Sequence, residues 1–94
     1  MNMKGEIERK LKKYFEITGK AIDIAKKAIN EKRKNEAVEV LEMASRYYDD
    51  AKFFEKQGQI INAFAALNYA HGWLDCGSRL RLFKVKDSKL FVVK

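Results

Sequence analysis

The sequence predicts an all-α protein, a three-helix up-and-down antiparallel bundle followed by a short extended or β-hairpin tail. Two observations predict this fold. The chain has no proline and five glycines, so few residues interrupt a helix. Its apolar residues recur at steps of three and four, which places them on one face of a helix. A chain of 94 residues is long enough for one domain with one core.

The first helix is expected over about residues 6–29. Its apolar stripe is Ile7, Leu11, Tyr14, Phe15, Thr18, Ile22, Ala25 and Ile29. Gly19 lies in the middle of this segment and is expected to mark a close approach between helices. The opposite face carries acid-before-base pairs four residues apart, such as Glu16 with Lys20. Interleaved charges of both signs are typical of a solvated helix face and not of a phosphate-binding track.

The second helix is expected over about residues 36–57 and the third over about 59–82. Asn35 is the expected N-cap of the second helix, with Glu36 favourable in its first turn. Gly58 is the expected left-handed stop. Because the connection that follows is so short, the second and third helices must run antiparallel.

The third helix has almost no polar side, because most of its residues from Ile60 to Leu74 are apolar. A helix that is apolar nearly all round is expected to be buried nearly all round. Two neighbouring helices cannot cover every side of it. We therefore expect either the C-terminal segment or a second copy of the chain to cover the remainder.

The last segment, residues 83–94, changes to a period of two. Residues 83–86 alternate, Asp87 and Ser88 suggest a turn, and residues 90–93 are apolar and β-prone. A hairpin would pair Val85 with Leu90 and Phe83 with Val92. An irregular tail is the alternative. In either form the segment needs a surface to lie on, since a lone hairpin is only marginally stable in water.

The residues that carry chemistry are sparse. His71 is the single histidine and Cys76 the single cysteine, so no zinc motif exists and neither a metal nor a cofactor is expected. These two side chains point ~140° apart on one helix, which excludes them as a nucleophile–base pair. His71 can meet Asp75, four residues on, but that pair lacks a nucleophile.

The remaining polar candidates do not form a catalytic set. Asp49 and Asp50 point ~100° apart on a helix. One of them is expected either to bond Asn62 or Asn68 of the third helix or to remain in solvent. No catalytic residue is assigned, and the chain is not expected to be an enzyme. The candidate polar cluster is Asp49, Asp50, Asn62, Tyr69, His71, Trp73 and Asp75.

The net charge of +7 is distributed unevenly. Residues 1–36 carry +5, residues 37–78 carry −3 and residues 79–94 carry +5. A basic excess favours an acidic partner such as nucleic acid, and the two basic clusters merge if the helix ends meet. The candidate nucleic-acid contacts are Lys32, Arg33, Lys34, Arg79, Arg81, Lys84 and Lys86.

Two segments resemble a known family. The run from Tyr48 to Gly58, and the Tyr-Ala-x-Gly-Trp-Leu-Asp segment over residues 69–75, are similar to the archaeal family catalogued as domain of unknown function 357. That resemblance implies a three-helix up-and-down bundle with no assigned activity. This chain departs from the family pattern at Gln59, where an acidic residue is usual, and at Cys76, where a small residue is usual.

A fainter resemblance is to the HEPN nucleic-acid-associated helical domains. Members with ribonuclease activity carry an arginine shortly before a histidine on one helix. No arginine stands within a few residues before His71, so the resemblance implies at most a catalytically inactive form.

Three functions are compatible with these features. The first is a non-enzymatic protein–protein interaction module that self-associates, as a dimer in the simplest case, through the third helix and the apolar tail. The second is an RNA- or DNA-binding accessory module that uses the basic ends. The third is a ligand or enzyme site near His71 and Asp75. No apolar run reaches the ~20 residues of a membrane helix, and a single cysteine suits a reducing cytoplasm.

Overall fold

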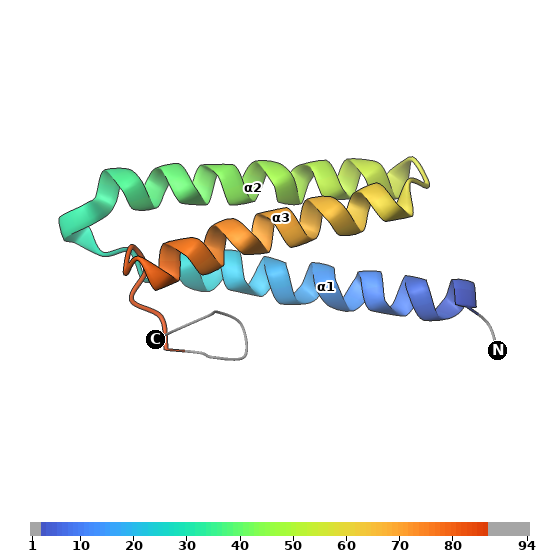
Figure 1. The fold of residues 1–94 in the computed structure, drawn as a ribbon, viewed down its shortest axis with the longest axis horizontal. Helices are drawn as coiled ribbons and strands as arrows, with labels where there is room; N and C mark the ends of the chain where they lie inside the picture. Colours follow the sequence, from blue (N-terminus) through green and yellow to red (C-terminus); the bar gives the residue numbers. More distant parts are fainter. Residues whose placement is uncertain (1–2, 87–94) are drawn as a thin grey trace.

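The computed structural model describes residues 3–86 and contains three long helices (Figure 1). They are α1 (Met3–Lys26), α2 (Lys34–Lys56) and α3 (Ile60–Arg79), with a short 3-10 helix, η1 (Glu31–Arg33), between α1 and α2. The helices lie side by side in an elongated molecule of 49 × 23 × 16 Å. The predicted all-α three-helix bundle is confirmed, and residues 3–86 contain no strand.

Helices α2 and α3 form a tight antiparallel hairpin, as predicted. Gly58 has φ +74°, the left-handed conformation that glycine adopts without steric cost. The N–H of Gln59 then donates to the carbonyl of Phe54 at 2.8 Å, which closes the turn. Helix α1 contacts both of these helices and runs opposite to α2 and in the same direction as α3, so the bundle runs up, down and up (Figure 1).

The core consists of two clusters along the axis of the bundle, and Tyr48 contacts both. One contains Leu11, Ala51, Ala63, Ala66 and Leu67; the other contains Ala21, Ile22, Ala25, Ala37, Leu41, Ala44, Leu74, Leu82 and Phe83. The hydroxyl of Tyr48 donates to the carbonyl of Phe15 at 3.1 Å. A Cβ on Gly19 would lie 2.7 Å from that hydroxyl, so the predicted close approach at Gly19 is confirmed.

Helix α1 ends at Lys26, three residues before the predicted end. Ala28 and Asn30 leave the helix because their backbone groups pair with the C-terminal segment. The N–H of Asn30 donates to the carbonyl of Leu82 at 2.8 Å, and the N–H of Lys84 donates to the carbonyl of Ala28 at 2.7 Å. These bonds frame an isolated antiparallel bridge between Ile29 and Phe83.

The beginning of the tail therefore packs on its own bundle. Leu82 and Phe83 are each 2% exposed, and the Phe83 ring lies against Gly77 near the end of α3. Within the described residues, the β-bridge of Phe83 is with Ile29 and not with a second strand of the tail. The predicted hairpin partners Leu90 and Val92 lie outside the described residues.

Two glycines of α3 give a matched test of this packing. A Cβ on Gly77 would overlap the Phe83 ring and lie 3.2 Å from Val40 Cγ1, whereas a Cβ on Gly72 would meet nothing within 4 Å. We expect Gly77→Ala to lower the free energy of unfolding by ~1–3 kcal/mol, because the core becomes overpacked. Gly72→Ala is expected to raise it by up to ~1 kcal/mol through helix propensity. Urea unfolding measures both, and equal effects would contradict the packing of Phe83.

Candidate functional site

The two basic segments meet at one end of the bundle, where α1 ends, α2 begins and α3 ends (Figure 1). Residues 26–36 and 79–86 together hold nine Lys or Arg residues and two Glu, a net charge of +7. We call this region the basic end. The whole chain carries the same net charge, so the charges of all other residues cancel.

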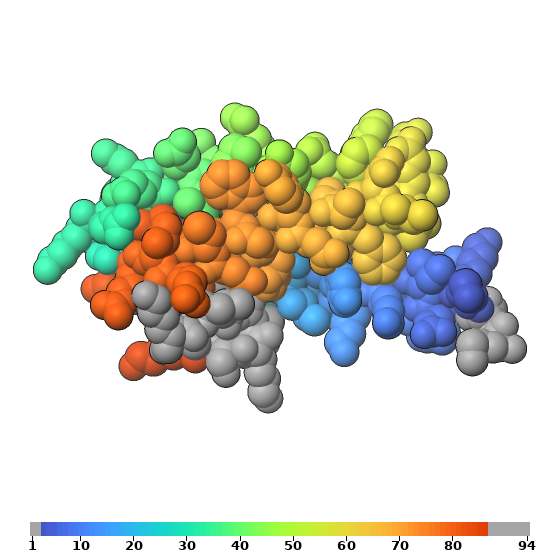
Figure 2. Space-filling model, viewed as in Figure 1, coloured from blue at the N-terminus to red at the C-terminus, as the bar shows by residue number. Residues whose placement is uncertain are grey.

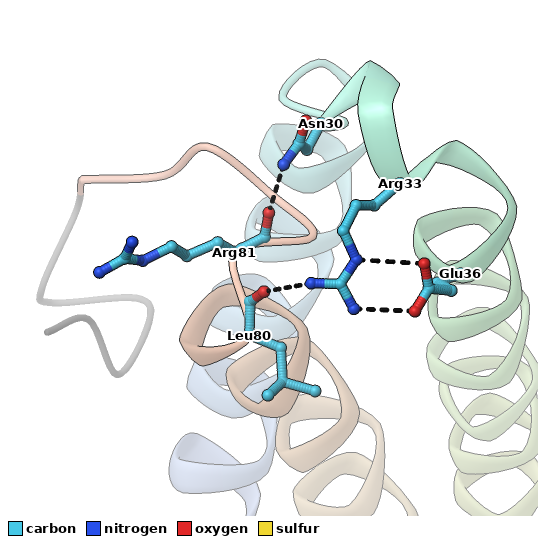
Figure 3. A network of polar contacts seen from close by, with 5 residues as sticks. All are labelled: Asn30, Arg33, Glu36, Leu80 and Arg81. Carbon is cyan, nitrogen blue, oxygen red and sulfur yellow. Dashed lines mark hydrogen bonds and ion pairs between the residues drawn. The ribbon is translucent and has the colours of Figure 1, made fainter.

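Arg33 ties the start of α2 to the end of α3. Its Nε and Nη2 donate to the two carboxylate oxygens of Glu36 at 3.1 and 2.8 Å, and its Nη1 donates to the carbonyl of Leu80 at 3.1 Å (Figure 3). Hydrogen bonding by Arg33 lowers the pKa of Glu36, and the same bond raises the pKa of Arg33. Three donors of this guanidinium are thus engaged within the protein.

Asn30 holds the basic end together through hydrogen bonds of its side chain and of its backbone. Its Oδ1 accepts from the N–H of Lys32 at 3.2 Å. Its Nδ2 donates to the carbonyl of Arg81 at 2.9 Å (Figure 3). Its own N–H bonds Leu82, as described above. The predicted cap at Asn35 is wrong: α2 begins at Lys34 without a side-chain cap. Because η1 runs directly into α2, the capping side chain lies one turn earlier, at Asn30.

Helix α3 ends at Arg79 and not near residue 82, as predicted. The N–H of Leu82 donates to the carbonyl of Gly77 at 2.9 Å, and the N–H of Arg81 to that of Ser78 at 3.1 Å. This pattern is a Schellman motif, which requires a left-handed residue at Arg81, where φ is +63°. Glycine is usual at that position, and a side chain there costs ~1 kcal/mol. Without a glycine, the sequence carries no signal of this stop.

The Schellman turn forms one wall of an open hollow of about 320 Å³. Its lining residues are Asn30, Ser78, Arg79, Arg81, Phe83, Lys84 and Val85. The side chain of Arg81 extends away from the Arg33 network (Figure 3). Arg79, Arg81 and Lys84 are exposed, and among residues 3–86 none of the three forms an ion pair. The hollow therefore presents three cationic groups to solvent.

The candidate polar cluster from the sequence is distributed over several places. Asp50, Asn62 and Tyr69 line an open hollow of about 460 Å³ between α2 and α3. The Nδ2 of Asn62 donates to Oε1 of Gln59 at 2.9 Å, and Asp50 is exposed. Asp49 lines a different groove, between α1 and α2, and Trp73 is half-buried against the core.

His71 lies on the side of α3 that faces α1. Its Nδ1 is 3.1 Å from the hydroxyl of Thr18, and its Nε2 is 3.8 Å from Oδ1 of Asp75. Sequence analysis placed Thr18 in an apolar stripe and missed this contact, because nothing in the spacing relates residues 53 positions apart. Thr18 is 3% exposed, and the adjoining hollow is only about 160 Å³. The contact joins α1 to α3.

An apolar stripe along α3 is open to solvent in the described structure. Ile61 is 84% exposed, Tyr69 55% and Leu80, just after the helix, 52%. Ala65 and Cys76 are also exposed, and Trp73 is half-buried. These residues follow one another at steps of three or four, so they share one helix face. Figure 2 shows α3, from yellow to orange, uncovered by α1 and α2 across this side of the molecule. We call this set the α3 stripe.

Comparison with known proteins places the chain in a family. A family described as "Protein of unknown function (DUF357)" matches residues 13–83, so the chain belongs to it and the resemblance noted from the sequence is confirmed. The match covers α2, α3 and the part of α1 from residue 13 onward, and it ends at Phe83. No curated protein and no solved structure matches the chain.

Residues 3–86 lack two features, a membrane-spanning helix and a cluster of metal ligands. No helix in this range is long and apolar enough to cross a bilayer. No group of three His, Cys, Asp or Glu residues in the same range is arranged to hold a metal ion.

The two asparagines near the start of α2 offer a matched test of the basic end. We expect Asn30→Ala to lower the free energy of unfolding by ~1–2 kcal/mol, since it removes a cap and the bond to Arg81. Asn35→Ala is expected to change it by less than ~0.5 kcal/mol, because Asn35 is exposed. Thermal or urea unfolding distinguishes them. A larger loss of unfolding free energy for Asn35→Ala than for Asn30→Ala would contradict this assignment and favour Asn35 as the cap, as the sequence predicted.

Proposed function

We propose that this protein is a non-enzymatic helical interaction module that self-associates through α3. The observation that carries the proposal is the exposed α3 stripe. Residues 60–74 contain no Asp, Glu, Lys or Arg, although 35% of the chain is charged. Depletion of charge together with exposed aromatic and aliphatic side chains is characteristic of the centre of a protein–protein interface.

The shape of the α3 stripe supports the same proposal. Ala65 is the small residue between Ile61 and Tyr69, so a second helix can approach closely there. The N-terminal half of α3 has a hollow on each side. One is the 460 Å³ hollow shared with α2, and the other is an apolar groove of about 480 Å³ that α3 shares with Met3 and Ile7 of α1. Ile61 lines the second of these hollows, which a partner side chain can fill.

A second candidate function is nucleic-acid binding by the basic end. The observation that favours it is the convergence of residues 26–36 and 79–86, which places a net charge of +7 at one end of the molecule. Proteins that bind nucleic acid obtain most of their affinity from Lys and Arg beside phosphates. The third possibility, a site near His71 and Asp75, gains no support, because the hollow beside His71 is only about 160 Å³ and Asp75 does not line it.

Self-association is tested by the molar mass in solution. We expect wild-type protein at tens of micromolar to elute as a dimer in size-exclusion chromatography with light scattering. Changing Ile61 and Tyr69 together to Ser is expected to weaken association at least ~10-fold, since each removes a large apolar contact. The matched control is Phe53→Ser, which alters an equally exposed aromatic residue on α2.

Two results would overturn this proposal. A wild-type protein that stays monomeric at these concentrations would remove self-association. A dimer that survives the Ile61 and Tyr69 changes but is lost with Phe53→Ser would move the interface from α3 to α2.

Nucleic-acid binding is tested by its salt dependence. We expect a mixed-sequence single-stranded RNA of ~20 nucleotides to bind at ~50 mM salt and to weaken steeply as salt rises, because each phosphate contact releases a counterion. Fluorescence anisotropy of labelled RNA measures this. The absence of binding at ~50 mM salt would exclude the second candidate.

A further inference from the structure

We infer that the 320 Å³ hollow at the basic end is a phosphate site for a nucleic-acid backbone, with Arg79, Arg81 and Lys84 as its contacts. This inference rests on the second candidate function and deepens it, because it assigns the contact to three residues among the many basic ones. The ligand is the phosphodiester group, bound without reading the base sequence.

The lining of the hollow has the chemistry of a phosphate site. Arg79, Arg81 and Lys84 contribute to its lining, and none of the described residues that line it is acidic. Guanidinium groups suit phosphate because their paired N–H donors match two phosphate oxygens. The deeper part of the lining is apolar: Phe83 is buried and Val85 is half-buried. The uncharged polar side chains of the lining, Asn30 and Ser78, already bond backbone groups of the protein. Contacts of arginine and lysine to phosphate carry no sequence information, so recognition of sequence is not expected.

The side chains available for contact are fewer than the sequence indicates. Arg33 was a candidate contact, but its guanidinium already binds Glu36 and the carbonyl of Leu80. The charge of Arg33 is therefore partly neutralised, and its structural role is to hold α3 against α2. Arg79, Arg81 and Lys84 have no such partner among residues 3–86 and surround the hollow.

A chain of phosphates fits this end better than one free phosphate does. Lys32, Lys34 and Lys86 are exposed on the segments that make up the same end, outside the lining of the hollow. A single phosphate in the hollow would leave these charges unused. A polymer that repeats its phosphate groups continues from the hollow across them, which is the usual arrangement of a backbone-binding surface.

Arg81 gives the inference a test in which stability and binding change in opposite directions. Its left-handed φ of +63° is a conformation that glycine adopts without cost. The bond from Asn30 reaches only the carbonyl of Arg81, so the Arg81→Gly variant keeps it. We expect this variant to raise Tm by about 2–5 °C while weakening RNA binding several-fold. A loss of affinity in a stabilised protein cannot be attributed to unfolding.

The main experiment compares two triple variants in which arginine and lysine are changed to glutamine. One removes Arg79, Arg81 and Lys84; the matched control removes Arg9, Lys12 and Lys13, which are exposed on α1 away from the basic end. With labelled single-stranded RNA of ~20 nucleotides, we expect the first variant to lose at least ~10-fold in affinity. Its salt slope should fall by about 2, since three contacts with single-stranded RNA are lost. The control should lose less than ~3-fold.

The remaining outcomes contradict either the assignment of the hollow or the binding of nucleic acid. If RNA binds wild-type protein and both triple variants weaken it equally, the hollow is not the site, although nucleic-acid binding stands. If wild-type protein binds no RNA at ~50 mM salt, both the second candidate function and this inference fail. Vesicles of phosphatidylserine and phosphatidylcholine serve as the competing polyanion. Binding to these vesicles that is tighter than binding to RNA would overturn the choice of nucleic acid.

Discussion

The basic end of this protein depends on the docking of Phe83 into the core. The ring fills space that exists only because residue 77 is glycine, and the backbone on either side of it pairs with residues 28 and 30. This pairing ends α1, positions η1 and brings the basic residues after α3 beside those before α2. An apolar contact within the core thus determines where most of the surplus positive charge lies.

The sequence was sufficient to predict the helices, because apolar periodicity and a glycine stop are local signals. Gly58 and the antiparallel hairpin that follows it are examples. The sequence was not sufficient where the decisive contact is remote. The end of α1 depends on Leu82, the cap belongs to Asn30 because the chain turns early, and Thr18 contacts a histidine on another helix. Composition identified the basic clusters correctly. The structure was needed to show which of their side chains already bind groups within the protein.

Charge and exposed apolar residues concentrate in different parts of this molecule. The N-terminal three quarters of α3, residues 60–74, contain no charged residue, whereas Glu31 and Glu36 are the acidic residues of the basic end. The α3 stripe and the basic end meet at Leu80 but are stabilised by different means: α3 by the close packing of alanines such as Ala63 and Ala66, and the basic end by hydrogen bonds to backbone carbonyls. Each can therefore be altered by substitution without direct damage to the other.

The elongated shape has a consequence for an assembled form. The apolar groove beside Ile61 lies toward the end of the 49 Å molecule that is opposite the basic end. A pair of molecules joined there would hold two cationic tips far apart on one rigid body. A polyanion long enough to reach both tips would bind with avidity, since the second encounter becomes intramolecular. Short fragments would gain nothing from the second tip, so such a pair would discriminate ligands by length and not by sequence.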